Sequence, residues 1–239
     1  MTDNTELFFH QQGKGPLVVL LHGLLMDGKC WQQSGLPASL SQNYRVVMPD
    51  LPGHGHSLAW PDGYNQQAMA TAVIALLDRL GYAKAHILGY SAGGWLAAGL
   101  LKYYPQRLSS VIIGGWDCIN GLPQGPNGAL SFAEFMTFAR ETAPELAGWV
   151  SAREEPALNA FFDLLSQPQQ VEEELKRRAV PALFWAGRED LCYPTIARWA
   201  ADCSFPLLTA EGDHLAAVRE PGAALIKEIC RFIARAEIA

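Results

Sequence analysis

The chain has 239 residues, of which 49% are hydrophobic and 18% charged, and its formal net charge is −6. This length suits one α/β domain with a modest insertion better than two independent domains. The acidic balance argues against nucleic acid as the main partner, because the longest basic run is only Lys176-Arg177-Arg178. No apolar run reaches the ~18 residues of a membrane span, so no membrane partner is expected.

The first residues, Met-Thr-Asp-Asn-Thr-Glu-Leu, lack the basic segment and the apolar stretch of a secretory signal. We therefore expect a cytoplasmic protein. The cysteines are odd in number, scattered and without metal-ligand spacing, which favours reduced thiols over a disulfide framework. They are Cys30, Cys118, Cys192, Cys203 and Cys230.

Short apolar segments alternate with longer helical patterns along the chain, which predicts parallel βαβ units with helices on both faces of the sheet. Strands are expected at Leu17–His22, Arg45–Asp50, Ala85–Tyr90, Ser110–Gly114, Ala182–Ala186 and Pro206–Ala210, with Leu7–His10 as a candidate edge strand. Helices are expected at Gln66–Leu80, Gly93–Tyr104, Thr195–Ala201 and Ala216 to about Ala234. The predicted fold class is α/β, with a mostly parallel twisted sheet.

The segment Gly89-Tyr-Ser91-Ala-Gly93 joins an expected strand to an expected helix. A serine on such a tight turn is held out of the sheet edge, and the flanking glycines leave room for the crossing chains. The amide of Ala92 then points from a helix N-terminus towards a developing oxyanion. In a glycine-rich chain this pattern also fits an ordinary βα turn, but the strand–turn–helix setting favours a nucleophile elbow.

Between Trp116 and Val180 the strand–helix alternation breaks. We expect residues 116–180 to form an inserted helical cap, and residues 1–115 and 181–239 to form the core. Aromatic side chains in the cap either line an apolar pocket or hold the cap to itself and to the sheet. They are Phe132, Phe135, Phe138, Trp149, Phe161 and Phe162.

A serine nucleophile needs a general base and an acid that orients it. His214 is the candidate base, because it follows the last expected strand, where open α/β sheets place their ligands. Asp190 is the candidate acid, because it follows the preceding strand and gives the chain order Ser, Asp, His. Asp117, which follows an earlier strand, is the main alternative. Glu189 and Asp213 are further ones.

The chain resembles the α/β-hydrolase fold superfamily, in its group of small hydrolases with a helical cap. Four motifs carry the resemblance: Leu20-Leu21-His22-Gly23, Asp50-Leu-Pro-Gly53-His-Gly55-His-Ser57, the Ser91 elbow, and the loops of Asp190 and His214. The resemblance implies Ser91 as nucleophile, His214 as base and later acid, and Asp190 as orienting acid. It implies the amides of Leu24 and Ala92 as oxyanion donors.

These residues predict a serine hydrolase that cleaves a small-molecule ester or thioester of a small to medium apolar acyl group through an acyl-enzyme on Ser91. This chemistry implies no metal and no organic cofactor. Similar proteins with the same triad also hydrolyse carbon–carbon bonds, act as cofactor-free peroxidases or transfer acyl groups, and some proteins of this fold are non-catalytic ligand receptors. The oligomeric state is not predicted.

Overall fold

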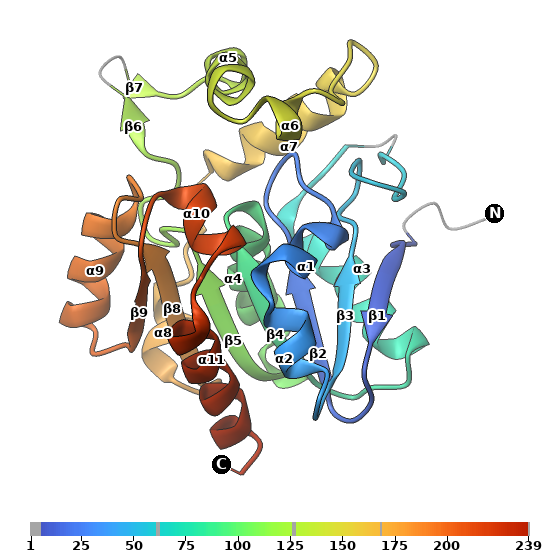
Figure 1. Ribbon diagram of the computed structural model, residues 1–239, viewed down its shortest axis with the longest axis vertical. Coiled ribbons are helices and arrows are strands. Elements are labelled where there is room, and N and C mark those ends of the chain that lie inside the picture. Colours follow the sequence, from blue (N-terminus) through green and yellow to red (C-terminus); the bar gives the residue numbers. More distant parts are fainter. Residues whose placement is uncertain (1–5, 61–62, 126–127, 168, 239) are drawn as a thin grey trace.

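The computed structural model describes residues 6–60, 63–125, 128–167 and 169–238. A seven-stranded sheet runs through the described part, in the order β1-β3-β2-β4-β5-β8-β9 (Figure 1). Within this sheet, as far as the described residues go, β1 alone is antiparallel to its neighbour. The strands are β1 (Phe9–Gln12), β2 (Leu17–Leu21), β3 (Arg45–Pro49), β4 (Ala85–Tyr90), β5 (Leu108–Gly114), β8 (Ala182–Gly187) and β9 (Leu207–Ala210). The predicted α/β fold class is confirmed.

Two hydrophobic clusters cover the two faces of the sheet, because successive side chains of a strand point to opposite faces. On β2, Val19 and Leu21 join one cluster with α3 (Gln66–Arg79), α4 (Ala92–Tyr103) and α9 (Tyr193–Asp202). Val18 and Leu20 join the other cluster. Its helices are α1 (Trp31–Ser34), α2 (Leu36–Leu40), α10 (His214–Arg219) and α11 (Ala223–Ala236).

The chain after β9 forms two helices where the sequence analysis predicted one. α10 ends at Arg219 and α11 begins at Ala223. Pro221 has no amide hydrogen to donate within a helix, and Gly222 has a φ of 80°, so a continuous helix cannot pass through this point. The predicted single helix over residues 216–234 is therefore wrong. The break lets α10 stay beside the strand ends while α11 crosses the sheet face (Figure 1).

Between β5 and β8 the chain leaves the sheet. It forms the antiparallel strands β6 (Gln124–Gly125) and β7 (Gly128–Ala129), then α5 (Phe132–Thr142), α6 (Pro144–Ala147), α7 (Glu155–Leu165) and α8 (Glu172–Arg177). α5, α6 and α7 lie beyond the carboxyl ends of the parallel strands, whereas α8 lies lower, beside the sheet (Figure 1). The candidate site lies at these strand ends.

Candidate active site

The turn between β4 and α4 holds Ser91 in a strained backbone conformation. Its φ is 56° and its ψ is −121°. Residues other than glycine rarely adopt this backbone conformation, and it persists where the surrounding structure enforces it. The Ser91 amide donates to the Gly114 carbonyl oxygen of β5 at 2.8 Å, which fixes the turn against the neighbouring strand.

Two glycines of the turn are needed because backbone atoms pass close to them. A Cβ added to Gly89 would overlap the Gly93 carbonyl oxygen, and a Cβ added to Gly93 would overlap the carbonyl oxygen of Leu21. Backbone atoms cannot swing aside as a flexible side chain can. The absence of both side chains therefore lets the start of α4 sit against the ends of β4 and β2.

His214 and Asp190 meet at the carboxyl ends of the parallel strands. Asp190 lies just after β8 and His214 is the first residue of α10, which follows β9. The Nδ1 atom of His214 lies 2.6 Å from Oδ2 of Asp190. The Asp190 side chain is almost fully buried, whereas the His214 side chain is 36% exposed. A buried carboxylate at this distance orients the imidazole and stabilises its protonated form.

The other candidate carboxylates have different partners. Asp117 accepts hydrogen bonds from the amides of Ile119 and Asn120 and from the Asn120 side chain, so it closes its own turn. Asp213 caps α10 by accepting from the amides at the start of that helix. The Glu189 side chain is exposed. Among the four candidates, a hydrogen bond to His214 is present only for Asp190 in the described residues.

The loop after β2 brings a second backbone amide towards Ser91. A Cβ added to Gly23 would lie 3.2 Å from the Ser91 Cβ, so this loop runs directly past the serine. The Leu24 amide follows Gly23, and the Ala92 amide opens α4. Within residues 6–60 and 63–125, neither amide donates to a protein acceptor. Two amides near one serine can stabilise the negative charge of a tetrahedral intermediate.

Comparison with known proteins shows the family of the chain. A family model described as alpha/beta hydrolase fold matches residues 16–148. Pimeloyl-[acyl-carrier protein] methyl ester esterase of Aeromonas hydrophila is 30% identical over 222 residues, covering 81% of this chain and 85% of that protein. The chain belongs to the α/β-hydrolase fold family. The resemblance drawn from the four motifs is thus confirmed.

Solved structures share the α/β-hydrolase fold at lower identity. The enol-lactonase of Burkholderia xenovorans is 22% identical with a TM-score of 0.76, covering 95% of this chain and 96% of that one. A thermophilic esterase of Thermogutta terrifontis is also 22% identical, with a TM-score of 0.74 and coverage of 96% and 93%. At this identity the likeness shows the fold alone.

Two buried histidines of this hydrolase hold the loop that carries Leu24. His22 accepts from the Leu51 amide at 2.9 Å, and its Nδ1 lies 2.8 Å from the Gly23 carbonyl oxygen. His54 accepts from the Leu25 amide at 3.3 Å. Burial lowers the pKa of both, that of His54 to about 3, so both stay neutral and can accept through Nε2. The resemblance implies a structural role for His22 and for the turn of residues 50–57, but the contacts with the Leu24 loop could not be predicted from it.

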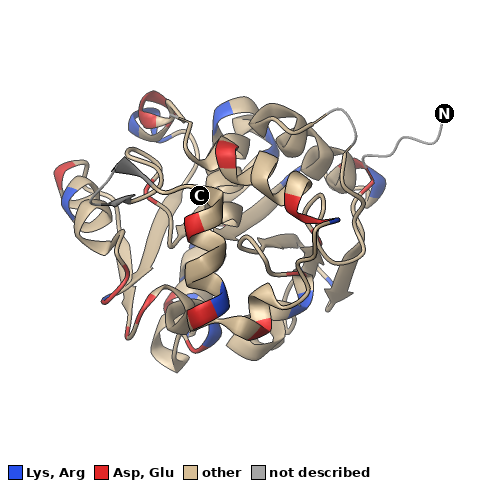
Figure 2. Cartoon of the chain, turned by 90° about the horizontal axis from the view of Figure 1, so that it is seen from above, with Lys and Arg blue, Asp and Glu red and all other residues tan. Residues whose placement is uncertain are grey.

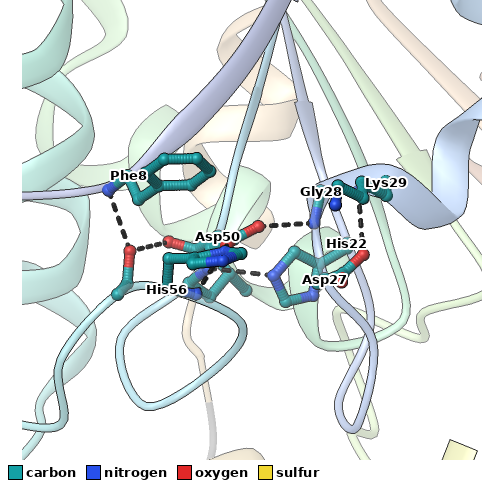
Figure 3. A network of polar contacts seen from close by, with 9 residues as sticks. Phe8, His22, Asp27, Gly28, Lys29, Asp50 and His56 are labelled. Carbon is teal, nitrogen blue, oxygen red and sulfur yellow. Dashed lines mark hydrogen bonds and ion pairs between the residues drawn. The ribbon is translucent and has the colours of Figure 1, made fainter.

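The glycine-rich turn after β3 is fixed by the buried carboxylate of Asp50 (Figure 3). Its two oxygens accept from the amides of Gly28 and His56, each at 2.8 Å. The Ser57 hydroxyl donates to the Asp50 carbonyl oxygen at 2.7 Å. A buried carboxylate paired with backbone amides locks the turn that carries His54 next to the loop of Leu24.

A cavity of about 860 Å³ lies beside the Leu24 loop, between the core and the residues of α6 and α7 in the predicted cap, 116–180. Leu25 and Met26 line it from the core, Leu146 and Trp149 from the cap, and Val218 from α10. Its rim carries both charge signs, from Asp27, Lys29, Glu145, Arg153, Glu154 and Arg219. Acidic and basic residues are similarly interspersed in the view from above (Figure 2). Its lining residues include Leu25, next to Leu24, but not Ser91, Asp190 or His214, so the cavity adjoins the candidate site and does not enclose it.

Two polar contacts tie the cap to the core at this cavity. The Trp149 indole donates to the Leu25 carbonyl oxygen at 3.0 Å. Arg219, at the end of α10, forms a 2.5 Å ion pair with Glu145 of α6. One cap contact therefore reaches the Leu24 loop, and the other reaches the helix that begins at His214.

Of the six aromatic residues singled out in the cap, Trp149 lines this cavity. Phe161 is buried and packs on His54, Tyr64 and Trp95. Phe138 is 60% exposed. The other three pack on one another: Phe132, Phe135 and Phe162. Three of the six rings therefore pack this segment on itself, and Phe161 packs it against the core.

The five cysteines form no disulfide, and Cys118 and Cys192 are buried. In the described ranges, no three or more His, Cys, Asp and Glu side chains gather where they could hold a metal ion. No helix of those ranges is long and apolar enough to cross a membrane.

Proposed function

We propose that this chain is a serine hydrolase that cleaves carboxylic esters or thioesters through an acyl-enzyme on Ser91. The observation that carries the proposal is the 2.6 Å pair of His214 and Asp190 at the sheet edge where the strained Ser91 turn lies. The free amides of Leu24 and Ala92 beside that turn support it. Nucleophile, base, orienting acid and oxyanion donors are the complete set for acyl transfer.

In the first half of the reaction, the Ser91 hydroxyl oxygen attacks the substrate carbonyl carbon and gives its proton to Nε2 of His214. The carbonyl oxygen becomes an oxyanion that accepts from the amides of Leu24 and Ala92. Asp190 stabilises the imidazolium through Nδ1. His214 then protonates the departing alkoxide or thiolate as its bond to carbon breaks, which leaves the acyl group on Ser91.

In the second half, water takes the place of the leaving group. His214 removes a proton from the water as it attacks the acyl carbon, and the same two amides hold the second oxyanion. The bond to Ser91 breaks, the serine oxygen recovers a proton from His214, and the carboxylic acid product leaves. No step needs a group beyond these residues and water.

The proposed substrate class is a small-molecule ester with a small to medium apolar acyl group. In this proposal the acyl group extends from Ser91 past the Leu24 loop into the adjoining cavity, which residues of the proposed cap, 116–180, help to line. The relative from Aeromonas hydrophila is named for a methyl ester, and the Burkholderia xenovorans structure is that of an enol-lactonase. Both names describe attack on an ester carbonyl.

The test is Ser91→Ala, measured on p-nitrophenyl esters and with a fluorophosphonate probe. Ser91 is partly exposed, so loss of its hydroxyl empties little core volume and the variant is expected to fold. Removal of a triad member typically lowers the rate by several orders of magnitude. We expect ester turnover and probe labelling both to disappear.

Retention of more than a few percent of wild-type turnover in Ser91→Ala would remove Ser91 from the role of nucleophile. A wild-type protein that neither labels nor turns over any ester would favour a ligand receptor. Labelling without ester turnover would favour carbon–carbon bond hydrolysis, peroxidation or acyl transfer by the same residues.

A further inference from the structure

Tyr90, the residue before Ser91, reaches across the sheet to the loop of His214. It is fully buried at the end of β4. Its hydroxyl donates to the His214 carbonyl oxygen at 2.7 Å. Its ring centroid lies 5.1 Å from that of the His214 imidazole and 4.9 Å from that of Trp185. One side chain therefore connects the neighbour of the nucleophile to the backbone of the base.

The strand order shows why such a link matters. β5 and β8 lie between β4 and β9, so His214 follows a strand about 14 Å from β4 at ~4.8 Å per strand. β9 is the edge strand and pairs only with β8 among the described strands. The peptide that carries His214 is thus held to the sheet from one side, and the Tyr90 hydroxyl supplies a second attachment from the centre.

The path of the Tyr90 ring is built into β5. A Cβ added to Gly114 would lie 2.6 Å from Cδ2 of Tyr90, and a Cβ added to Gly115 would lie 2.6 Å from Cζ. Gly115 has a φ of 54°, and its amide donates to the Trp185 carbonyl oxygen of β8 at 2.8 Å. Two successive glycines therefore form a flat surface over which the phenol ring crosses β5.

We propose that Tyr90 is a positioning residue that sets the distance between the Ser91 oxygen and the His214 imidazole. This inference rests on the proposed serine hydrolase function. Asp190 controls the rotation of the His214 ring through Nδ1, whereas Tyr90 holds the main chain from which that ring projects. Displacement by 1 Å of a group in the reacting geometry can lower a rate about 100-fold, so a loose His214 loop slows proton transfer.

Burial raises the pKa of Tyr90 well above its usual value, and the nearby Asp190 carboxylate adds to this effect. The hydroxyl therefore keeps its proton and remains a hydrogen-bond donor at neutral pH. This also separates Tyr90 from the reacting groups, because it neither gives up its proton nor touches the substrate carbonyl.

The test compares Tyr90→Phe with Tyr82→Phe. Each substitution removes one hydroxyl that donates to a backbone carbonyl oxygen distant in sequence, since the Tyr82 hydroxyl donates to Gly15 at 2.9 Å. The Gly15 contact precedes β2 and lies at the opposite end of the strands from Ser91. Both variants lose a hydroxyl-to-carbonyl hydrogen bond, a partly buried one at the site for Tyr90 and an exposed one away from it for Tyr82.

For Tyr90→Phe we expect kcat to fall about tenfold to 100-fold with KM little changed, since the substrate surfaces are intact. The second-order rate of fluorophosphonate labelling should fall in parallel, because it needs the same serine–histidine geometry. Tyr82→Phe should keep the wild-type kcat and labelling rate. Expressing kcat per labelled site removes any contribution from unfolded protein, so a poorly folding variant still reports on geometry.

Wild-type kcat per labelled site in Tyr90→Phe would overturn the inference, as would an equal loss in Tyr82→Phe. Ser91→Ala, assayed alongside, separates the two proposals. An inactive Ser91→Ala with an unaffected Tyr90→Phe would refute the role of Tyr90 alone. An active Ser91→Ala would refute the proposed function itself.

Discussion

At the scale of single residues, the hydrogen-bond partners of two aspartates distinguish the candidate acid from its main alternative. Asp190 and Asp117 both follow parallel strands of the sheet, and both are buried. One carboxylate oxygen of Asp190 accepts from the Cys192 amide, and the other lies within hydrogen-bond distance of His214. Both carboxylate oxygens of Asp117 accept hydrogen bonds from residues of its own turn, Ile119 and Asn120. The structure therefore brings Asp190, and not Asp117, to the histidine.

We expect Asp190→Asn to lower kcat far more than Asp117→Asn. The amide that replaces Asp190 favours the wrong tautomer of His214 and cannot stabilise its imidazolium, a change that costs ~10⁴ in rate in serine proteases. Asp117→Asn should act through stability, because it disturbs a turn away from the imidazole. The measurement is kcat per folded protein for both variants, and a larger loss in Asp117→Asn would place the acid on the other strand.

At the scale of elements, the cap and the Leu24 loop are mechanically connected. Trp149 both lines the cavity and donates to the Leu25 carbonyl oxygen. Phe138 lies in the same cap on an exposed face. Truncation of Trp149 therefore enlarges the cavity, whereas truncation of Phe138 does not.

We expect the wild-type protein to turn over soluble short-chain p-nitrophenyl esters with a higher kcat/KM than an emulsified long-chain triglyceride, because pocket volume limits the acyl group. Trp149→Ala should shift the preferred chain length upwards, and Phe138→Ala should leave it unchanged. The measurement is kcat/KM over an acyl-chain series. Activation by the emulsion would make the cap a lipase lid, and an equal shift in both variants would exclude Trp149 as the wall.

At the scale of the whole molecule, three buried histidines make folding sensitive to acid. Burial lowers the pKa of His22, His54 and His86 in the folded chain. His22 and His54 contact the loop that carries Leu24. His86 forms hydrogen bonds with Ser110 and with Glu237, near the end of the chain. In the unfolded chain each titrates near ~6.5. Below that pH the unfolded state binds more protons, so stability falls as pH falls.

We expect the free energy of unfolding to fall between pH 7 and pH 5. Each such histidine contributes a limiting slope of roughly 1.4 kcal/mol per pH unit below its unfolded pKa and above its folded one. His54→Gln should remove one such contribution, because its folded pKa of about 3 lies below the whole range. His10→Gln, a partly exposed residue of the edge strand β1, is the control. Urea denaturation at several pH values measures the slopes, and equal slopes in both variants would contradict the assignment.

The sequence by itself determined what depends on local pattern. Alternating apolar segments specify strands and helices, and glycines beside Ser91 specify a turn that only small residues permit, so the fold and the candidate nucleophile could be read from neighbouring residues. The position of His214 directly after the last strand could be predicted from local pattern as well. The prediction of one continuous last helix was wrong, because it followed the helical spacing of apolar residues and overlooked the break at Pro221 and Gly222.

Only the tertiary structure decided which distant groups meet. Asp190 and Asp117 are alike in sequence, because both follow strands that end at one edge, and the difference lies in which hydrogen bonds the packed loops make. The Tyr90–His214 bond joins residues 124 apart and depends on two glycines of a third segment. Local pattern fixes the direction in which a side chain leaves its strand, but its partner is fixed by the packing of the whole chain.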